Sequence, residues 1–148
     1  MSVRAPSIAL AMLLFLWSGT AAAERTAVLI TNEQCPVSDL SKLQIRKAYL
    51  GILVTAGDHE IRPLRLTADE DLNRVFLQNI VAMSEKSYQR RALSLAVKFG
   101  TPRPDEFSSL EQAVEAMRKT TCSVIFLWAS TAAAIDESKV VTVLWRGD

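Results

Sequence analysis

The amino-acid sequence predicts an α/β fold, in which strands alternate with helices in layers around one sheet. An apolar run at 28–30 leads through a polar turn into a helical segment that ends at Gly51. The run SVIFLW at 123–128 is apolar on both faces, which is typical of a central strand covered on both sides. A helical turn at 129–135 and a last strand at 140–145 are expected to close the chain.

The first half of the chain is expected to contain two strands, each followed by a helix. After the strand at 28–30, a helix begins at Ser38 or Ser41. A second strand covers 61–66, and the next helix begins at about Asp69. The apolar positions of that helix recur at helical spacing, at Leu72, Val75, Phe76, Ile80 and Met83.

Two further helices are expected between the second strand and the central strand. One begins within 84–87 and ends at Gly100, with Pro102 beyond it. Ser109 and Gln112 predict a capping box at the start of the other. The residues of these helices that should face the core are Tyr88, Ala92, Leu95, Ala96 and Phe99, and then Leu110, Ala113, Val114 and Met117.

The N-terminal segment, residues 1–23, has the pattern of a signal peptide. Arg4 supplies a positive charge, the apolar run at 8–17 is too short for a permanent membrane span, and Ala21-Ala22-Ala23 fits a cleavage site. We expect export and cleavage after Ala23, with an uncleaved anchor as the alternative. Residues 24–148 then form a single domain, without a later stretch apolar enough to span a membrane.

The charge and the side-chain inventory exclude several function classes. The chain has 17 basic and 16 acidic residues, so nothing pulls it towards nucleic acid. His59 is the one histidine and has no Cys or His near it in sequence, so no metal site is expected. No serine lies in a nucleophile elbow, and acid, base and nucleophile cannot be assembled. We therefore expect neither an enzyme nor a bound cofactor.

The segment 27–51 resembles a known family. Its motifs are Asn32 at the strand end, then Pro36-Val37, Leu40-Ser41, Gln44-Ile45-Arg46 and Tyr49-Leu50-Gly51. This order is similar to the second lobe of the phosphate-type periplasmic solute-binding proteins, especially their short single-lobe members. The later Phe-Gly-Thr-Pro-x-Pro stretch and the paired final strands agree with the same family. The resemblance implies a PBP-like domain in the periplasm: one three-layer lobe of the type 2 periplasmic-binding fold, with a mostly parallel central sheet flanked by helices.

The resemblance also implies a ligand site after the second strand. The family holds its oxyanion with an Arg and with a Ser-Gly-Thr type turn at the following helix N-terminus, where free N–H groups favour an anion. In this sequence Arg65 matches the Arg, Thr67 lies beside it, and Asn32 ends the first strand. The turn itself reads Ala68-Asp69-Glu70-Asp71, and its carboxylates should repel phosphate. The family's later Gly-Tyr is replaced by Phe126-Leu127.

Each candidate residue has a structural alternative. Asn32 is a favoured turn residue and can simply cap or turn the chain. Arg65, like Arg62 and Arg74, can be a surface charge paired with a carboxylate. These alternatives leave open whether the three candidates contact a ligand at all.

Two functions remain open. The first is a non-catalytic exported accessory or interaction module, with a phosphate ABC transporter substrate-binding-like lobe and a partner such as an envelope protein or a transporter or sensor component. The second is a half-cleft that binds a small oxyanion together with a partner or a dimer mate, because the chain has length for one lobe.

The expected compartment favours a disulfide between the two cysteines, whereas the expected strand topology argues against it. An exported chain with two cysteines is ordinarily oxidised. However, if the first and central strands run parallel, as the resemblance implies, Cys35 and Cys122 lie at opposite ends of the sheet, about 15 Å apart. Because a disulfide needs Cα atoms within about 7 Å, we expect no bond.

Overall fold

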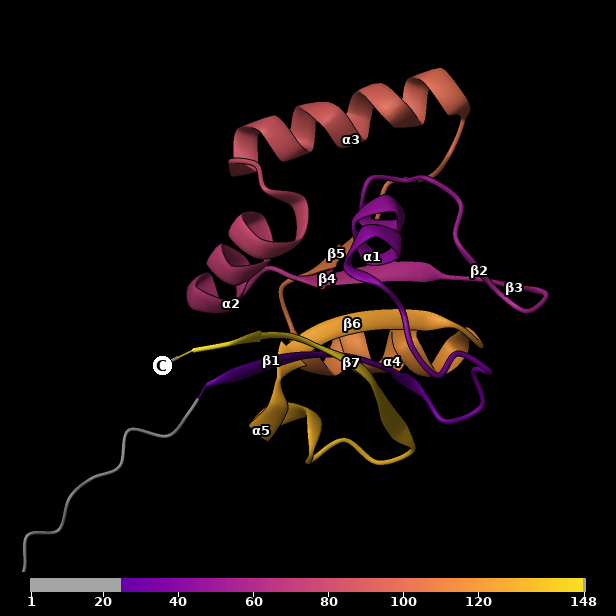
Figure 1. Ribbon diagram of the computed structural model, residues 1–148, viewed down its shortest axis with the longest axis vertical. Helices are drawn as coiled ribbons and strands as arrows, with labels where there is room; N and C mark the ends of the chain where they lie inside the picture. The colour runs from indigo at the N-terminus through magenta and orange to yellow at the C-terminus, as the bar shows by residue number, and fades with distance from the viewer. Residues whose placement is uncertain (1–24, 148) are drawn as a thin grey trace, which may run out of the picture.

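The computed structural model describes residues 25–147, and within them one sheet of five strands forms the middle of the molecule (Figure 1). The expected signal peptide, residues 1–23, lies outside the described residues. The strands follow the order β5-β4-β6-β1-β7 across the sheet. Their bounds are Thr26–Asn32 (β1), Arg62–Leu66 (β4), Asp105–Phe107 (β5), Ser123–Trp128 (β6) and Ser138–Arg146 (β7). A separate small ribbon joins β2 (Thr55–Ala56) and β3 (His59–Glu60).

Helices cover the sheet on both sides, which confirms the three-layer α/β class. Figure 1 shows α1, α2 and α3 on one side of the sheet and α4 and α5 on the other. The strand at 123–128 is central and buried, as its apolar sequence predicts. The bounds of the helices are Lys42–Tyr49 (α1), Glu70–Val75 (α2), the π-helix Phe76–Val81 (η1), Glu85–Phe99 (α3), Leu110–Lys119 (α4) and Ala129–Ala132 (α5).

The sheet is mixed, and the direction of β1 corrects one expectation. β4 runs parallel to β5 and β6, whereas β1 is antiparallel to both of its neighbours, β6 and β7. Four strands therefore point one way and β1 points the other. The expectation that β1 and β6 run parallel is wrong, because β1 lies in the middle of the sheet with its direction opposite to that of β6.

The direction of β1 also decides the cysteines. Because the two strands are antiparallel, the end of β1 lies beside the start of β6. Cys35 and Cys122 face each other there with their Cα atoms 5.0 Å apart and form a disulfide with an S–S distance of 2.06 Å. The expectation of two free thiols is wrong for this reason.

The helix ends also differ from the expected caps. Ser41 begins α1 with a capping box to Gln44. The box expected from Ser109 and Gln112 is absent, because the Ser109 hydroxyl makes no cap bond. Ser109 has φ −125°, compared with −69° at Ser41, so the two residues enter their helices with different backbone geometry.

The helix expected from Asp69 is divided into two parts. Asp69 does cap it, but α2 passes into the π-helix η1, which ends at Ala82 in the left-handed region with φ 53°. The wider π turn places Phe76 face to face with Phe126 of β6, at 4.8 Å between ring centroids. This stack joins the helical layer to the central strand.

Two tyrosines tie α1 and α3 to the same aromatic cluster. Tyr49 and Tyr88 each meet the Phe76 ring edge to face, at 5.0 and 5.3 Å. The Tyr49 hydroxyl donates to the Leu64 carbonyl at 2.7 Å, and the Tyr88 hydroxyl donates to the Tyr49 carbonyl at 2.8 Å. Burial raises the pKa of both phenols, which keeps them neutral donors.

Candidate ligand site

Asn32 lies at the end of β1 and uses its whole amide within the chain. Its nitrogen donates to the Thr120 and Met117 carbonyls, at 2.7 and 3.4 Å. Its oxygen accepts the backbone N–H groups of Gln34 and Cys35, both at 3.1 Å. The side chain therefore shapes the turn after β1 and caps the C-terminal end of α4, which is the structural alternative stated for it above.

Arg65 lies on β4 with its side chain fully buried, so it is not the surface charge that the alternative describes. Its guanidinium stacks over the rings of Phe76 and Tyr88, with its central carbon 4.8 and 5.1 Å from their centroids. It pairs with two carboxylates: Glu85 at the start of α3, at 2.5 and 3.0 Å, and Glu106 of β5, at 3.2 Å. Asn73 of α2 accepts a further hydrogen bond from it.

Arg65 and its two carboxylate partners stabilise one another in their charged forms. The hydrogen bond from Arg65 lowers the pKa of Glu85 to about 2. Burial disfavours the charge of Arg65, but the two carboxylates outweigh it and raise the pKa of the guanidinium. One cation thus faces two anions. Its Nε is the atom of this guanidinium that has no partner among the described residues.

Thr67 follows β4 and contacts β5 rather than an open site. Its N–H and its hydroxyl both donate to the Phe107 carbonyl, at 2.9 and 3.2 Å. Beyond it, Asp69 caps α2 by accepting the Leu72 N–H at 3.0 Å, and its second oxygen accepts the indole N–H of Trp128 at 2.8 Å. The N-terminus of α2 is therefore occupied by a carboxylate of the chain itself.

The hollow beside this turn is acidic. It has a volume of about 460 Å³ and is lined by Leu66, Leu110 and residues 68–71. Asp71 accepts from Arg25 and Arg74, both at 3.0 Å, so these two cations are also paired. An anion that entered here would meet Asp69, Glu70 and Asp71 before it met an unpaired cation.

The three predicted site residues do not converge. Arg65 and Thr67 lie near the end of β4, which runs parallel to β6. Asn32 lies at the end of β1, which is antiparallel to β6, so it sits beside the start of that strand. Three to five residues of strand separate the two places, roughly 10–17 Å along the sheet.

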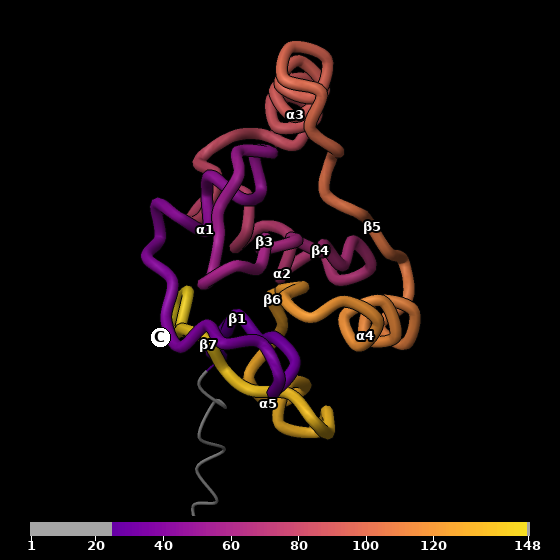
Figure 2. Tube along the Cα trace, turned by 90° about the vertical axis from the view of Figure 1, so that its right-hand side faces the viewer, coloured from indigo at the N-terminus to yellow at the C-terminus, as the bar shows by residue number. Residues whose placement is uncertain are grey.

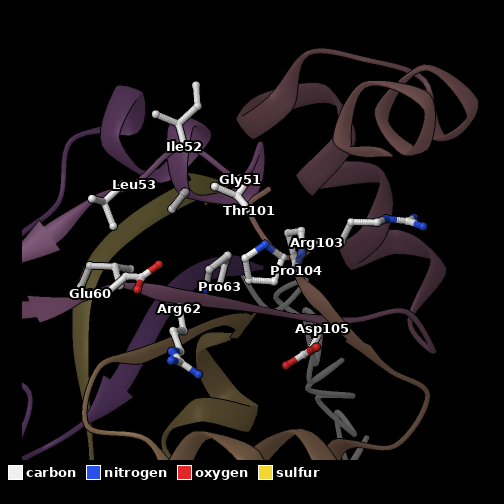
Figure 3. A pocket seen from close by; sticks show the side chains of 13 residues that line it. Gly51, Ile52, Leu53, Glu60, Arg62, Pro63, Thr101, Arg103, Pro104 and Asp105 are labelled. Carbon is white, nitrogen blue, oxygen red and sulfur yellow. The ribbon is translucent and has the colours of Figure 1, made fainter. Parts of the chain in front are cut away.

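A second recess, missed in the sequence, lies between three connecting segments (Figure 3). It has a volume of about 200 Å³ and is lined by Ala48 and by residues 51–53, 60–63 and 101–105. Figure 3 shows the guanidinium groups of Arg62 and Arg103 pointing apart, so they do not form an anion clamp. The only sequence signals were Gly51, which has φ 82°, and the prolines after α3, because the walls come from distant segments.

Other site types find no support in the described part of the chain. Within residues 25–147, no group of three His, Cys, Asp or Glu side chains is placed to hold a metal ion. None of the helices in the same range has the length and apolar character needed to cross a bilayer.

The structure resembles one lobe of phosphate-binding proteins. No family model matches the chain, and no curated protein matches its sequence. An ABC-type phosphate transport receptor from Vibrio cholerae matches 80% of this chain, with a TM-score of 0.58, at 12% identity. PstS from Borrelia burgdorferi gives the same TM-score, coverage and identity, and a Clostridium perfringens protein with bound phosphate gives 0.56 at 17% identity.

The likeness concerns the fold alone and covers part of each of those proteins. The aligned residues span 46%, 45% and 47% of the three matched chains, which is about one lobe. The expected α/β lobe is thereby confirmed as a fold.

Proposed function

We propose that this chain is a non-catalytic periplasmic accessory or interaction module, built on one lobe of the phosphate-binding protein fold. The observation that carries the proposal is the state of Arg65. The residue that matches the family's anion-binding Arg is fully buried and paired with Glu85 and Glu106. A bound oxyanion would have to displace carboxylates of the chain itself, and leaving these charges without their partner is costly.

Two further observations support the proposal. The helix N-terminus at which an oxyanion would bind is capped by Asp69 and followed by Glu70 and Asp71. The disulfide between Cys35 and Cys122 is typical of a protein that works in an oxidising compartment such as the periplasm. The chain thus has the fold of the lobe, but the turn at which an oxyanion would bind carries the negative charges of Asp69, Glu70 and Asp71.

The alternative function is a half-cleft for a small oxyanion, completed by a partner or a dimer mate, and one observation favours it. The Nε of Arg65 is buried and lacks a partner, and Thr67 lies two residues away. A ligand that reached this N–H group would satisfy it. We rank this function second because the same guanidinium already binds two carboxylates.

Calorimetry with inorganic phosphate separates the two functions. We expect no binding heat and no rise in melting temperature when millimolar phosphate or sulfate is added to the mature protein at neutral pH, because a ligand of the native state must stabilise it. Micromolar phosphate binding would contradict the proposal. A triple variant with Asp69→Ser, Glu70→Gly and Asp71→Thr is the matched comparison, and should gain weak phosphate affinity at some cost in helix stability.

A further inference from the structure

The C-terminal half of α3 has the sequence of a buried helix but is exposed. Six of the eight residues from 92 to 99 are apolar: Ala92, Leu93, Leu95, Ala96, Val97 and Phe99. At 100° per residue they cover about 200° of the helix circumference, and Ser94 and Lys98 lie on the remaining side. An apolar surface of this width normally packs against other parts of a protein. Here Leu93, Val97 and Phe99 are 51%, 79% and 61% exposed.

The exposure arises because α3 leaves the body of the molecule. Tyr88 and Ala92 are buried, but Phe99, on the same face of the helix, is largely exposed, so the expectation that Phe99 faces the core is wrong. In both views the helix stands apart from the sheet, above the segment that follows α1 (Figures 1 and 2). The first half of α3 is anchored through Glu85 and Tyr88, and the second half projects from that anchor.

The apolar residues point to opposite sides of the helix. At 100° per residue, Val97 and Phe99 lie about 160° apart around its axis. A flat surface, such as a lipid bilayer, can cover one of these sides but not both. A groove that receives the helix covers both at once.

The charges around this segment indicate the chemistry of the groove. α3 carries four basic residues and one acidic residue, Glu85, which is already paired with Arg65. α1, on the same side of the sheet, carries three basic residues and no acidic one. A second copy of the chain would bring like charges together, so a two-fold α3 pair is disfavoured. The basic residues are Lys86, Arg90, Arg91 and Lys98 on α3, and Lys42, Arg46 and Lys47 on α1.

We propose that the C-terminal half of α3 inserts into an apolar groove of a partner protein whose rim carries Asp and Glu side chains. Leu93, Val97 and Phe99 are the anchors, and the basic residues of α3 meet the rim. The ion pairs and the Tyr88 hydrogen bond hold the helix ready before binding, which lowers the ordering cost. This inference rests on the proposed role as an interaction module and names the surface and the partner chemistry.

The test is photo-crosslinking in the native host, with a photoreactive amino acid at position 97 of the full chain. The matched control carries it at Val140 of β7, which is 54% exposed. We expect an adduct with one protein from position 97 and none from position 140. The crosslinked site of the partner should be an apolar groove flanked by carboxylates.

Two sets of variants test whether the adduct depends on the apolar anchors and on the basic residues. Leu93→Ser with Phe99→Ser should reduce it at least tenfold without changing the melting temperature, since both side chains are largely exposed. Arg90→Glu with Arg91→Glu should also reduce the adduct at least tenfold. Replacing Asp or Glu residues at the rim of the partner's groove by Lys should then restore it. If the yield of the adduct is the same with and without the charge reversal, the proposal is overturned.

Other outcomes overturn the inference in distinguishable ways. Adducts with lipid show a membrane surface, adducts between two copies show a dimer, and the absence of any adduct shows that the segment has no partner. None of these results touches the proposed function, which falls only if the phosphate titration shows tight binding. If a partner is crosslinked from position 140 alone, the role as an interaction module stands, but the binding surface is β7 and not α3.

Discussion

At one end of the sheet the chain is held by a covalent bond and neutral hydrogen bonds, whereas at the other end it is held by ion pairs around the buried Arg65. Asn32 and the disulfide join β1 to α4 and β6. Arg65 joins β4 to the start of α3 through Glu85. Both ends fasten a helix to the sheet, but the first should respond to reduction and the second, whose two carboxylates are partly exposed, to acid.

The largest effect should come from breaking the covalent end. Replacing Cys35 and Cys122 together by Ala removes a crosslink between residues 87 positions apart. In the chain-entropy model this loop length corresponds to about 4–5 kcal/mol of stability. Urea unfolding of the variant and the oxidised protein should give this difference in the free energy of unfolding.

Reduction of the unmodified protein is the control for this prediction. Dithiothreitol should destabilise the native chain and leave the double variant unchanged. Two thiols titrated in the unreduced, unfolded protein would show that the disulfide is absent.

A smaller effect should come from the neutral hydrogen bonds. Asn32→Ala leaves two carbonyls and two N–H groups without their side-chain partner, which should cost about 2–3 kcal/mol of stability. Asn32→Asp is the matched comparison, because it keeps the acceptor for Gln34 and Cys35 but places a carboxylate oxygen against the Thr120 and Met117 carbonyls. Since this oxygen cannot donate and repels both carbonyls, thermal unfolding should place the variant no higher than the alanine variant at neutral pH. Equal melting temperatures for all three would show that the amide bonds contribute nothing.

The smallest effect should come from acid at the charged end. The pKa of Glu85 is lowered from 4.5 to about 2 in the folded protein, so its contribution to stability is complete above pH 4.5 and is lost as the pH falls towards 2. Because the Glu85 side chain is nearly half exposed, we expect about 1–2 kcal/mol. The measurement is the difference in unfolding free energy between the native protein and Glu85→Gln at pH 6 and at pH 2.

That difference should be present at pH 6 and close to zero at pH 2. A difference that does not change with pH would mean that the charge of Glu85 is unimportant. The Asn32→Ala variant should show no such dependence, which separates the two ends of the sheet.

Local sequence patterns predicted the positions of β1, β4, β6, β7 and the longer helices, but not the short strands β2, β3 and β5. Strand β6 follows from its apolar run, and α3 ends at Gly100, which has φ 66°, as its sequence indicates. The direction of β1 could not be predicted in this way, because alternation of apolar residues is the same in parallel and antiparallel strands. The error about the disulfide followed from that single choice.

The candidate site was harder to predict because its partners are distant in sequence. Arg65 was singled out correctly as a residue of interest, but Glu85 and Glu106 lie 20 and 41 positions away. No local pattern indicates that these carboxylates meet it or that its side chain is buried. The π turn of η1, which brings Phe76 under the guanidinium, also has no signature in the sequence.

The central place of β1 has a consequence for the order in which the chain can fold. β1 begins at Thr26, yet both of its neighbours in the sheet, β6 and β7, begin more than ninety residues later. Contacts of such long range form slowly, because a large loop must close first. As the chain emerges from its N-terminus, the apolar residues of β1 must wait for the last quarter of the sequence before they are covered. Until its C-terminal strands arrive, the nascent chain therefore exposes an apolar strand with two unpaired edges, a type of surface that is prone to aggregation.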